Sequence, residues 1–195
     1  LVAAPIPSLE RYEGKPVYYT DIVVKADSGA QTIEDTFGGV VGYTLADSMS
    51  GGVAFRNYLE PFHLAKGARL YRDAVGELIH ARGVIEAIHE GRVDVGPLDS
   101  YYHDLLKQYE PELTAKVRTV ATTIPTPIRP LIATAALTDD ELERLRTALA
   151  ATADAPEIAH LMRRLLLKGF AFPNAADYQI IASIADKPLP SFEEI

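Results

Sequence analysis

The most informative stretch of the sequence is Asp47-Ser48-Met49-Ser50-Gly51-Gly52. Residues 39–44 before it have the pattern of a short buried strand, and residues 53–59 after it have that of the first turns of a helix. Small residues that open a helix leave backbone N–H groups without acceptors, and these groups, with the Ser48 and Ser50 hydroxyls, favour a bound anion. An ordinary serine N-cap uses the same residue types. We call residues 47–52 the Ser-Gly turn, and the rest of the chain has to decide between the two interpretations.

The amino-acid composition excludes several classes of function. The 195 residues are 48% hydrophobic, which is enough for one large domain or two small lobes. The net charge is −8 and the pI about 5.1, which argues against a nucleic-acid partner because phosphate backbones need clustered Lys and Arg. One small anion needs only local donors. The sequence has no apolar run of the roughly 20 residues that span a membrane, and the absence of cysteine excludes disulfides, iron–sulfur clusters and thiol catalysis.

Strand-like and helix-like segments alternate up to about residue 134. Strands are predicted at 17–25, 39–44, 68–75, 93–98, 117–123 and 131–134, and helices at 51–64, 79–89, from 101 onward, 138–151, 155–168 and 174–185, with Pro188 and Pro190 marking a loose tail. This order predicts an α/β fold with mostly parallel pairing of its strands. Ligands of such sheets lie beyond the carboxyl ends of the strands, where the Ser-Gly turn and Asp99 both fall. The coincidence favours a binding cleft over two unrelated helix caps.

Five motifs occur in a familiar order along the chain. They are Tyr18-Tyr19-Thr20-Asp21-Ile22-Val23-Val24, Ile33-Glu34-Asp35, Asp47-Ser48-Met49-Ser50-Gly51, Gly91-Arg92-Val93-Asp94-Val95-Gly96-Pro97-Leu98-Asp99-Ser100 and Thr126-Pro127-Ile128-Arg129-Pro130. With them, nearly the whole chain resembles the phosphonate/phosphate-type substrate-binding proteins of ABC transporters. The resemblance implies the type II periplasmic-binding-protein fold, an α/β fold in which two lobes, joined by two crossing strands, close over a ligand.

The resemblance also implies how the chain divides. Lobe two would comprise residues 28–122, and lobe one residues 1–27 and 123–195, with crossing strands near 17–26 and 117–134. The family pattern has further residues before the position of Leu1, including the first strand and helix of lobe one. We therefore expect lobe one to be incomplete at its N-terminus and to expose apolar surface, and we expect the chain to self-associate through that surface.

Residues of the Ser-Gly turn are implied to bind the ligand. Ser48, the amide of Met49, and Ser50 with its amide would hold the oxygens of a phosphonate or phosphate, and Gly51 belongs to the same set. From the geometry of a helix start we expect the N–H groups of residues 49 to 52 to point at one common position.

Three more residues complete the implied site. Tyr18 matches an aromatic residue that contacts the ligand where the first crossing strand begins. Asp99 matches a polar position that faces the cleft, where it would pair with a ligand amine or accept a hydrogen bond from a protonated oxygen. His80 lies one residue earlier than the histidine that often precedes the Gly-x-x-Asp run, and we include it among the ligand-binding residues.

The resemblance implies a solute-binding component that delivers a small oxyanion, such as phosphonate, phosphate or phosphite, to an ABC transporter permease in the periplasm and catalyses nothing. We expect no catalytic residue, cofactor or metal. The histidines form no HxxxH or HxH pair, no Gly-x-Ser-x-Gly elbow is present, and the run Tyr101–Asp104 indicates a ligand wall or an interface. Two alternatives remain open: an enzyme on the same scaffold, for instance one for a thiamine or pyrimidine precursor, and a sensory ligand-binding domain.

Overall fold

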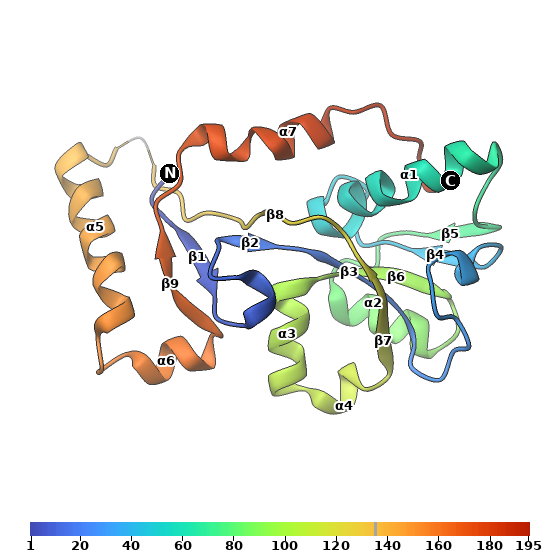
Figure 1. Ribbon diagram of the computed structural model, residues 1–195, viewed down its shortest axis with the longest axis horizontal. Helices are drawn as coiled ribbons and strands as arrows, with labels where there is room; N and C mark the ends of the chain where they lie inside the picture. The colour runs from blue at the N-terminus through green and yellow to red at the C-terminus, as the bar shows by residue number, and fades with distance from the viewer. Residues whose placement is uncertain (135) are drawn as a thin grey trace. The chain divides into compact units, whose positions relative to one another are not determined.

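The computed structural model describes residues 1–134 and 136–195, which divide into two compact units (Figure 1). Unit 1 consists of Leu1–Tyr18 and Thr126–Ile181, and unit 2 of Tyr19–Pro125 and Ala182–Ile195. The chain therefore passes from one unit to the other at three places, after Tyr18, after Pro125 and after Ile181.

Unit 2 is built on a five-stranded sheet in the order β5-β4-β6-β3-β7. The strands are β3 (Thr20–Lys25), β4 (Val40–Gly42), β5 (Asp73–Val75), β6 (Val95–Asp99) and β7 (Val117–Thr122). β4 pairs in parallel with β5 and β6, whereas β3 pairs antiparallel with β6 and β7. The prediction of mostly parallel pairing is therefore wrong. The four strands linked through helices run one way, but β3 enters the sheet directly from unit 1 and runs the other way between two of them.

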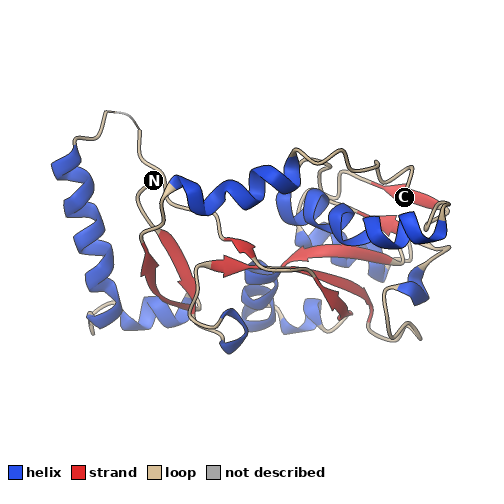
Figure 2. Ribbon diagram, turned by 45° about the horizontal axis from the view of Figure 1, so that its top comes forward, coloured by secondary structure: helices blue, strands red, loops and turns tan. Residues whose placement is uncertain are grey.

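Helices cover both faces of this sheet (Figure 2). They are η2 (Glu34–Thr36), η3 (Met49–Val53), α1 (Ala54–Lys66), α2 (Ala81–His89), α3 (Ser100–Tyr109) and α4 (Pro111–Thr114). Ile22 and Val24 of β3 pack in one apolar cluster with α1, and Val23 between them packs in the other with α2. A strand covered on both faces is apolar at every position rather than alternating. This explains the continuous run of β-branched residues in β3.

The C-terminal segment also belongs to unit 2. Phe192 and Ile195 are 2% and 0% exposed, and the Phe192 ring stacks on Tyr43 with centroids 4.3 Å apart. The carbonyl oxygen of Ile195 accepts the N–H groups of Leu70 and Tyr71. The prediction of a loose tail is wrong because these two side chains fill the apolar cluster beside α1.

Unit 1 contains two small antiparallel sheets. β1 (Ala4–Pro7) pairs with β9 (Leu167–Ala171), and β2 (Val17–Tyr18) pairs with β8 (Thr126–Pro127). Its helices are η1 (Glu10–Tyr12), α5 (Asp139–Ala151), η4 (Thr152–Asp154), α6 (Ala159–Arg164) and η5 (Ala175–Tyr178), and α7 (Gln179–Ala185) continues into unit 2. α5 begins with a capping box, in which Thr138 and Glu141 are bonded to each other's backbone N–H.

Two segments of unit 1 differ from the sequence prediction. The helix expected over 155–168 is reduced to α6, and its end turns through Leu166, whose φ is +53°, into β9. Pairing with β1 overrides the helical propensity there, which local sequence cannot reveal. The strand expected at 131–134 amounts to one bridge between Leu131 and Ala3.

Candidate functional site

Polar residues at the starts of three helices lie at one edge of the unit 2 sheet. Because β5, β4 and β6 are parallel, their carboxyl ends meet at the same edge. The Ser-Gly turn follows β4, His80 precedes the helix after β5, and Asp99 is the last residue of β6. The predicted placement of the turn and Asp99 at strand carboxyl ends is confirmed. We call this place the carboxyl edge.

The Ser-Gly turn opens the helix with one wide turn. The carbonyl oxygen of Ser48 accepts the N–H groups of Gly52 and Val53 at 2.8 and 2.9 Å, and Ser48 Oγ accepts the N–H of Gly51 at 3.3 Å. Ser48 is therefore the N-cap, as the plain interpretation predicted. The amides of Gly51 and Gly52 are engaged within the turn, so the expectation that four N–H groups point outward is wrong. Those of Met49 and Ser50 stand first in the helix, where helix geometry supplies no acceptor.

The Ser50 side chain differs from that of Ser48. Ser50 is 6% exposed, and its hydroxyl has no hydrogen-bond partner among the described residues. Ser48 Oγ accepts a bond from Gly51, and this leaves its own proton to be donated elsewhere. Ser50 Oγ is not among the described polar atoms that are fully buried without a partner, so it keeps contact with solvent, where a ligand or water can bond to it. The turn therefore offers two hydroxyl donors and two amide donors.

Close contacts explain why the turn has glycine at positions 51 and 52. A Cβ on Gly51 would lie 1.6 Å from Thr44 Oγ1, and one on Gly52 would lie 2.4 Å from the carbonyl oxygen of Leu45. Thr44 also donates its N–H to the carbonyl oxygen of Gly51 at 3.2 Å. The glycines thus allow the turn to pack directly on the loop that follows β4.

Thr20, which the sequence prediction missed, holds the turn from the other side. Its hydroxyl Oγ1 donates to the carbonyl oxygen of Ser50 at 3.1 Å, and its N–H donates to Thr123 Oγ1 at 3.0 Å. Thr20 is 1% exposed. In the sequence it is one residue of a strand, and nothing local distinguishes it from a residue that only packs.

The start of α3 lies at the same edge. Asp99 Oδ1 accepts the N–H of Tyr102 at 3.0 Å and so caps the helix. Ser100 and Tyr19 exchange two bonds, with the N–H of Tyr19 donating to Ser100 Oγ at 2.8 Å and the N–H of Ser100 donating to the Tyr19 carbonyl oxygen at 3.0 Å. Burial, with the negative charge of Asp99, raises the pKa of Tyr101 to about 12, so its phenol keeps its proton at neutral pH.

His80 and Tyr18 have different surroundings. His80 caps α2, with Nδ1 accepting the N–H of Gly83 at 3.2 Å, and the neutral ring therefore carries its proton on Nε2. Tyr18 lies in β2 of unit 1, is 3% exposed, and has the guanidinium carbon of Arg129 5.9 Å from its ring centroid. The other expected ligand residues all belong to unit 2. Their roles in binding stay predictions.

The comparison with protein families decides the class of the protein. The family described as ABC transporter, phosphonate, periplasmic substrate-binding protein matches residues 2–178. The chain belongs to this family. The resemblance inferred from the sequence motifs is confirmed. No curated protein matches the chain.

Solved structures share the fold of this phosphonate-binding family member at low sequence identity. A binding protein component of an ABC phosphonate transporter from Pseudomonas aeruginosa has a TM-score of 0.74 and 17% identity over 93% of this chain, which spans 60% of that protein. PhnD1 from Prochlorococcus marinus, in complex with methylphosphonate, has a TM-score of 0.75 and 14% identity over 95% of this chain and 71% of its own. A Xanthomonas citri protein bound to chloride ion has a TM-score of 0.63 and 20% identity over 94% of this chain and 69% of its own. These likenesses confirm the type II periplasmic-binding-protein fold.

In this family member, the prediction that Tyr101–Asp104 forms a ligand wall or interface is wrong for His103. The side chain is 3% exposed, and Nδ1 lies 2.8 Å from Oδ2 of Asp21, which is 0% exposed. Thr122 Oγ1 donates to the other Asp21 oxygen at 3.2 Å. The helix turns His103 toward β3, so the pair joins α3 to the sheet.

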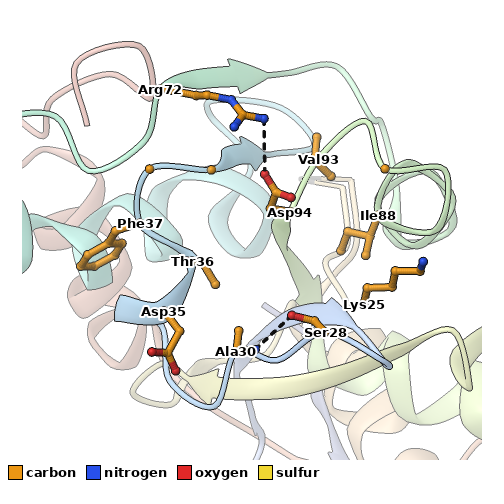
Figure 3. A pocket seen from close by; sticks show the side chains of 13 residues that line it. Lys25, Ser28, Ala30, Asp35, Thr36, Phe37, Arg72, Ile88, Val93 and Asp94 are labelled. Carbon is orange, nitrogen blue, oxygen red and sulfur yellow. Dashed lines mark hydrogen bonds and ion pairs between the residues drawn. The ribbon is translucent and has the colours of Figure 1, made fainter.

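A separate cavity of about 390 Å³ lies at the opposite edge of the unit 2 sheet, near the amino ends of β4 and β5 (Figure 3). Arg72 faces Asp94 across it at 4.0 Å, and Asp94 Oδ2 also accepts the N–H of Val40 at 2.7 Å. Lys25 and Asp35 add one more charge of each sign to its lining. Because the charges balance, this cavity has no preference for an anion, and the carboxyl edge is the better candidate.

Within residues 1–134 and 136–195, no group of three or more His, Cys, Asp or Glu side chains is arranged to hold a metal ion. In the same residues, none of the helices has both the length and the apolar character that crossing a membrane requires.

Proposed function

We propose that the chain binds a small tetrahedral oxyanion, a phosphonate, phosphate or phosphite, with the Ser-Gly turn as its oxyanion site. The observation that carries the proposal is the Ser50 hydroxyl, which belongs to a residue only 6% exposed and has no partner in the described part of the chain. It stands beside the amides of Met49 and Ser50 at the start of a helix, where the backbone dipoles favour negative charge. The methylphosphonate complex of the Prochlorococcus marinus protein supports the same ligand class.

The donor set constrains the charge of the ligand. Hydroxyls and amides recognise an oxyanion by hydrogen bonds, without a neutralising cation in the turn. Asp99, at the same edge, would repel a fully deprotonated ligand and accept a hydrogen bond from a protonated oxygen or pair with an amine. We therefore expect a singly protonated oxyanion or an amino-substituted one to bind best, with His80 and Tyr18 as further contacts.

We also propose that the protein delivers this ligand to an ABC transporter permease in the periplasm and catalyses no reaction. Family membership supports the transport role. Hydrolysis by Ser48 or Ser50 would need a nearby base. His80 uses Nδ1 to cap α2, and His103 is buried against Asp21, so neither is available to activate these serines.

Self-association through unit 1 is a further part of the proposal. Unit 1 exposes several large apolar side chains, among them Ile132 at 75%, Leu165 at 50% and Leu131 at 45%. Every residue of α5 is exposed or half-buried, although the helix carries three leucines. Apolar surface of this kind commonly marks an interface.

Titration calorimetry tests the ligand class directly. The chain would be titrated with methylphosphonate, phosphite and phosphate, with sulfate as an oxyanion that carries no proton at neutral pH. We expect saturable binding of at least one phosphorus oxyanion and weaker binding of sulfate. Absence of both heat and thermal stabilisation with all three phosphorus ligands would contradict the proposal.

A further inference from the structure

Thr20 occupies the point where three parts of unit 2 meet. It is the first residue of β3 and comes two residues after the last residue of unit 1 in this part of the chain, Tyr18. Its side chain is buried and reaches the Ser-Gly turn, because Oγ1 donates to the Ser50 carbonyl oxygen at 3.1 Å. One hydroxyl therefore connects the beginning of the strand to the backbone of the turn.

The backbone of Thr20 connects to the second place where the chain leaves unit 2. Its N–H donates to Thr123 Oγ1 at 3.0 Å, and its carbonyl oxygen accepts the N–H of Thr123 at 3.0 Å. Thr123 lies two residues before Pro125, after which the chain enters unit 1. Thr123 is buried as well, and its hydroxyl donates to the carbonyl oxygen of Ile124 at 3.2 Å.

We propose that Thr20 is a positioning residue that couples ligand binding at the Ser-Gly turn to the two strands by which the chain leaves unit 2. The inference rests on the proposed oxyanion function of that turn. The bond from Thr20 fixes the carbonyl of Ser50, and with it the residue whose amide and hydroxyl face the ligand. The Ser50 carbonyl shares a peptide group with the Gly51 N–H, which donates to Ser48 Oγ at 3.3 Å. An oxyanion that accepts the Ser48 proton therefore strengthens the Thr20 bond through this chain, since linked hydrogen bonds reinforce one another.

The coupling is reciprocal. If bound ligand strengthens the hydrogen bonds of Thr20, then those hydrogen bonds must raise the affinity for the ligand by the same factor. Removal of the Thr20 hydroxyl should therefore weaken ligand binding. Other bonds to the turn, such as those from Thr44, hold its fold but do not lead to a strand that enters unit 1. Thr20 thus differs from residues that merely stabilise the turn.

Three variants separate positioning from stability. Thr20→Val removes the donor at nearly constant shape, and Thr20→Ser keeps it. Thr114→Val is the matched control, because Thr114 is also buried and its hydroxyl donates to a carbonyl, that of Pro111 at 3.2 Å in α4. With methylphosphonate, phosphite and phosphate in calorimetry, we expect Thr20→Val to weaken binding about three- to tenfold, Thr20→Ser to restore it to within about twofold, and Thr114→Val to leave it unchanged.

Hydrogen exchange of the Tyr19, Thr20 and Thr123 amides, with and without saturating methylphosphonate, supplies a second readout. We expect the ligand to slow exchange in the wild type and in Thr20→Ser but not in Thr20→Val. Wild-type exchange that does not respond to bound ligand would overturn the inference even if Thr20→Val failed to fold, and so would equal affinities of wild type and Thr20→Val. If the wild type binds none of the three oxyanions, the proposed function is wrong, and the inference, which rests on it, is wrong as well.

Discussion

Ser48 and Ser50 have opposite hydrogen-bonding roles although they are two residues apart. Ser48 Oγ accepts the N–H of Gly51 at 3.3 Å, whereas the Ser50 hydroxyl has no partner in the described structure. Ser48 is therefore the helix cap that one interpretation of the turn predicts. The other interpretation, that Ser50 binds an anion, stays a prediction.

Replacement of Ser48 by Ala should cost stability as well as affinity. Loss of an N-cap lowers the free energy of unfolding by about 0.5–2 kcal/mol. Ser50→Ala removes a hydroxyl that has no partner within the described residues, so the free energy of unfolding should change little while ligand affinity falls about tenfold. Urea unfolding and calorimetry of both variants measure the difference. Equal loss of stability in the two variants would contradict the assignment of roles.

Gly51→Ala should disrupt the turn itself. A Cβ at this position would lie 1.6 Å from Thr44 Oγ1, so either the turn or the loop after β4 must move. We expect lower thermal stability and loss of oxyanion binding. Gly29→Ala is the matched control, since a Cβ there has no atom within 4 Å, and it should leave both properties unchanged. A Gly51→Ala variant with wild-type affinity would show that the packing of the turn is unimportant for binding.

Much of unit 2 follows from the sequence because its signals are local. The turn at 47–52, the helix that became α2 and the place of Asp99 at the carboxyl end of a strand were all predicted from residue types and spacing. The reversed direction of β3, the strand β9 and the buried Phe192 were not, because each depends on a partner far away in the chain. Thr20 and Thr123 escaped detection for the same reason.

The stability of the protein should fall at alkaline pH through its buried tyrosines. Burial raises the pKa of Tyr71 well above its ordinary value and that of Tyr101 to about 12, so both are harder to ionise when folded than when unfolded. Below about pH 10 both tyrosines are protonated in the folded and in the unfolded state, so their pKa shifts do not affect stability. As the pH rises from about 10 to 12, the unfolded state loses these protons first, and the folded state becomes less stable.

Thermal unfolding measured across this range checks the prediction. The midpoint should fall less steeply in Tyr71→Phe and Tyr101→Phe than in the wild type, because the phenol that resists ionisation has been removed. Tyr109→Phe, at a side chain that is 50% exposed, is the control and should keep the wild-type slope. An unchanged slope in all three variants would assign the alkaline transition to other groups.

Self-association should depend on the apolar surface of unit 1. Ile132→Glu places a charge on a side chain that is 75% exposed, and we expect it to reduce the concentration-dependent increase in mass seen by light scattering. Leu64→Glu alters a similarly exposed leucine of unit 2, at 70%, and should have no effect. A wild-type chain that stays monomeric at high concentration would refute the expected association.

Calorimetry of Ser50→Asp tests whether the Ser-Gly turn holds an anion. The new carboxylate would occupy the place of the oxyanion and repel it, while aspartate is tolerated near a helix start, so the chain should still fold. We expect binding of methylphosphonate, phosphite and phosphate to fall below that of Ser50→Ala, which itself should be weakened about tenfold. If Ser50→Asp binds the wild type's oxyanion as tightly as the wild type does, the turn is only a helix cap and the account of its function is wrong.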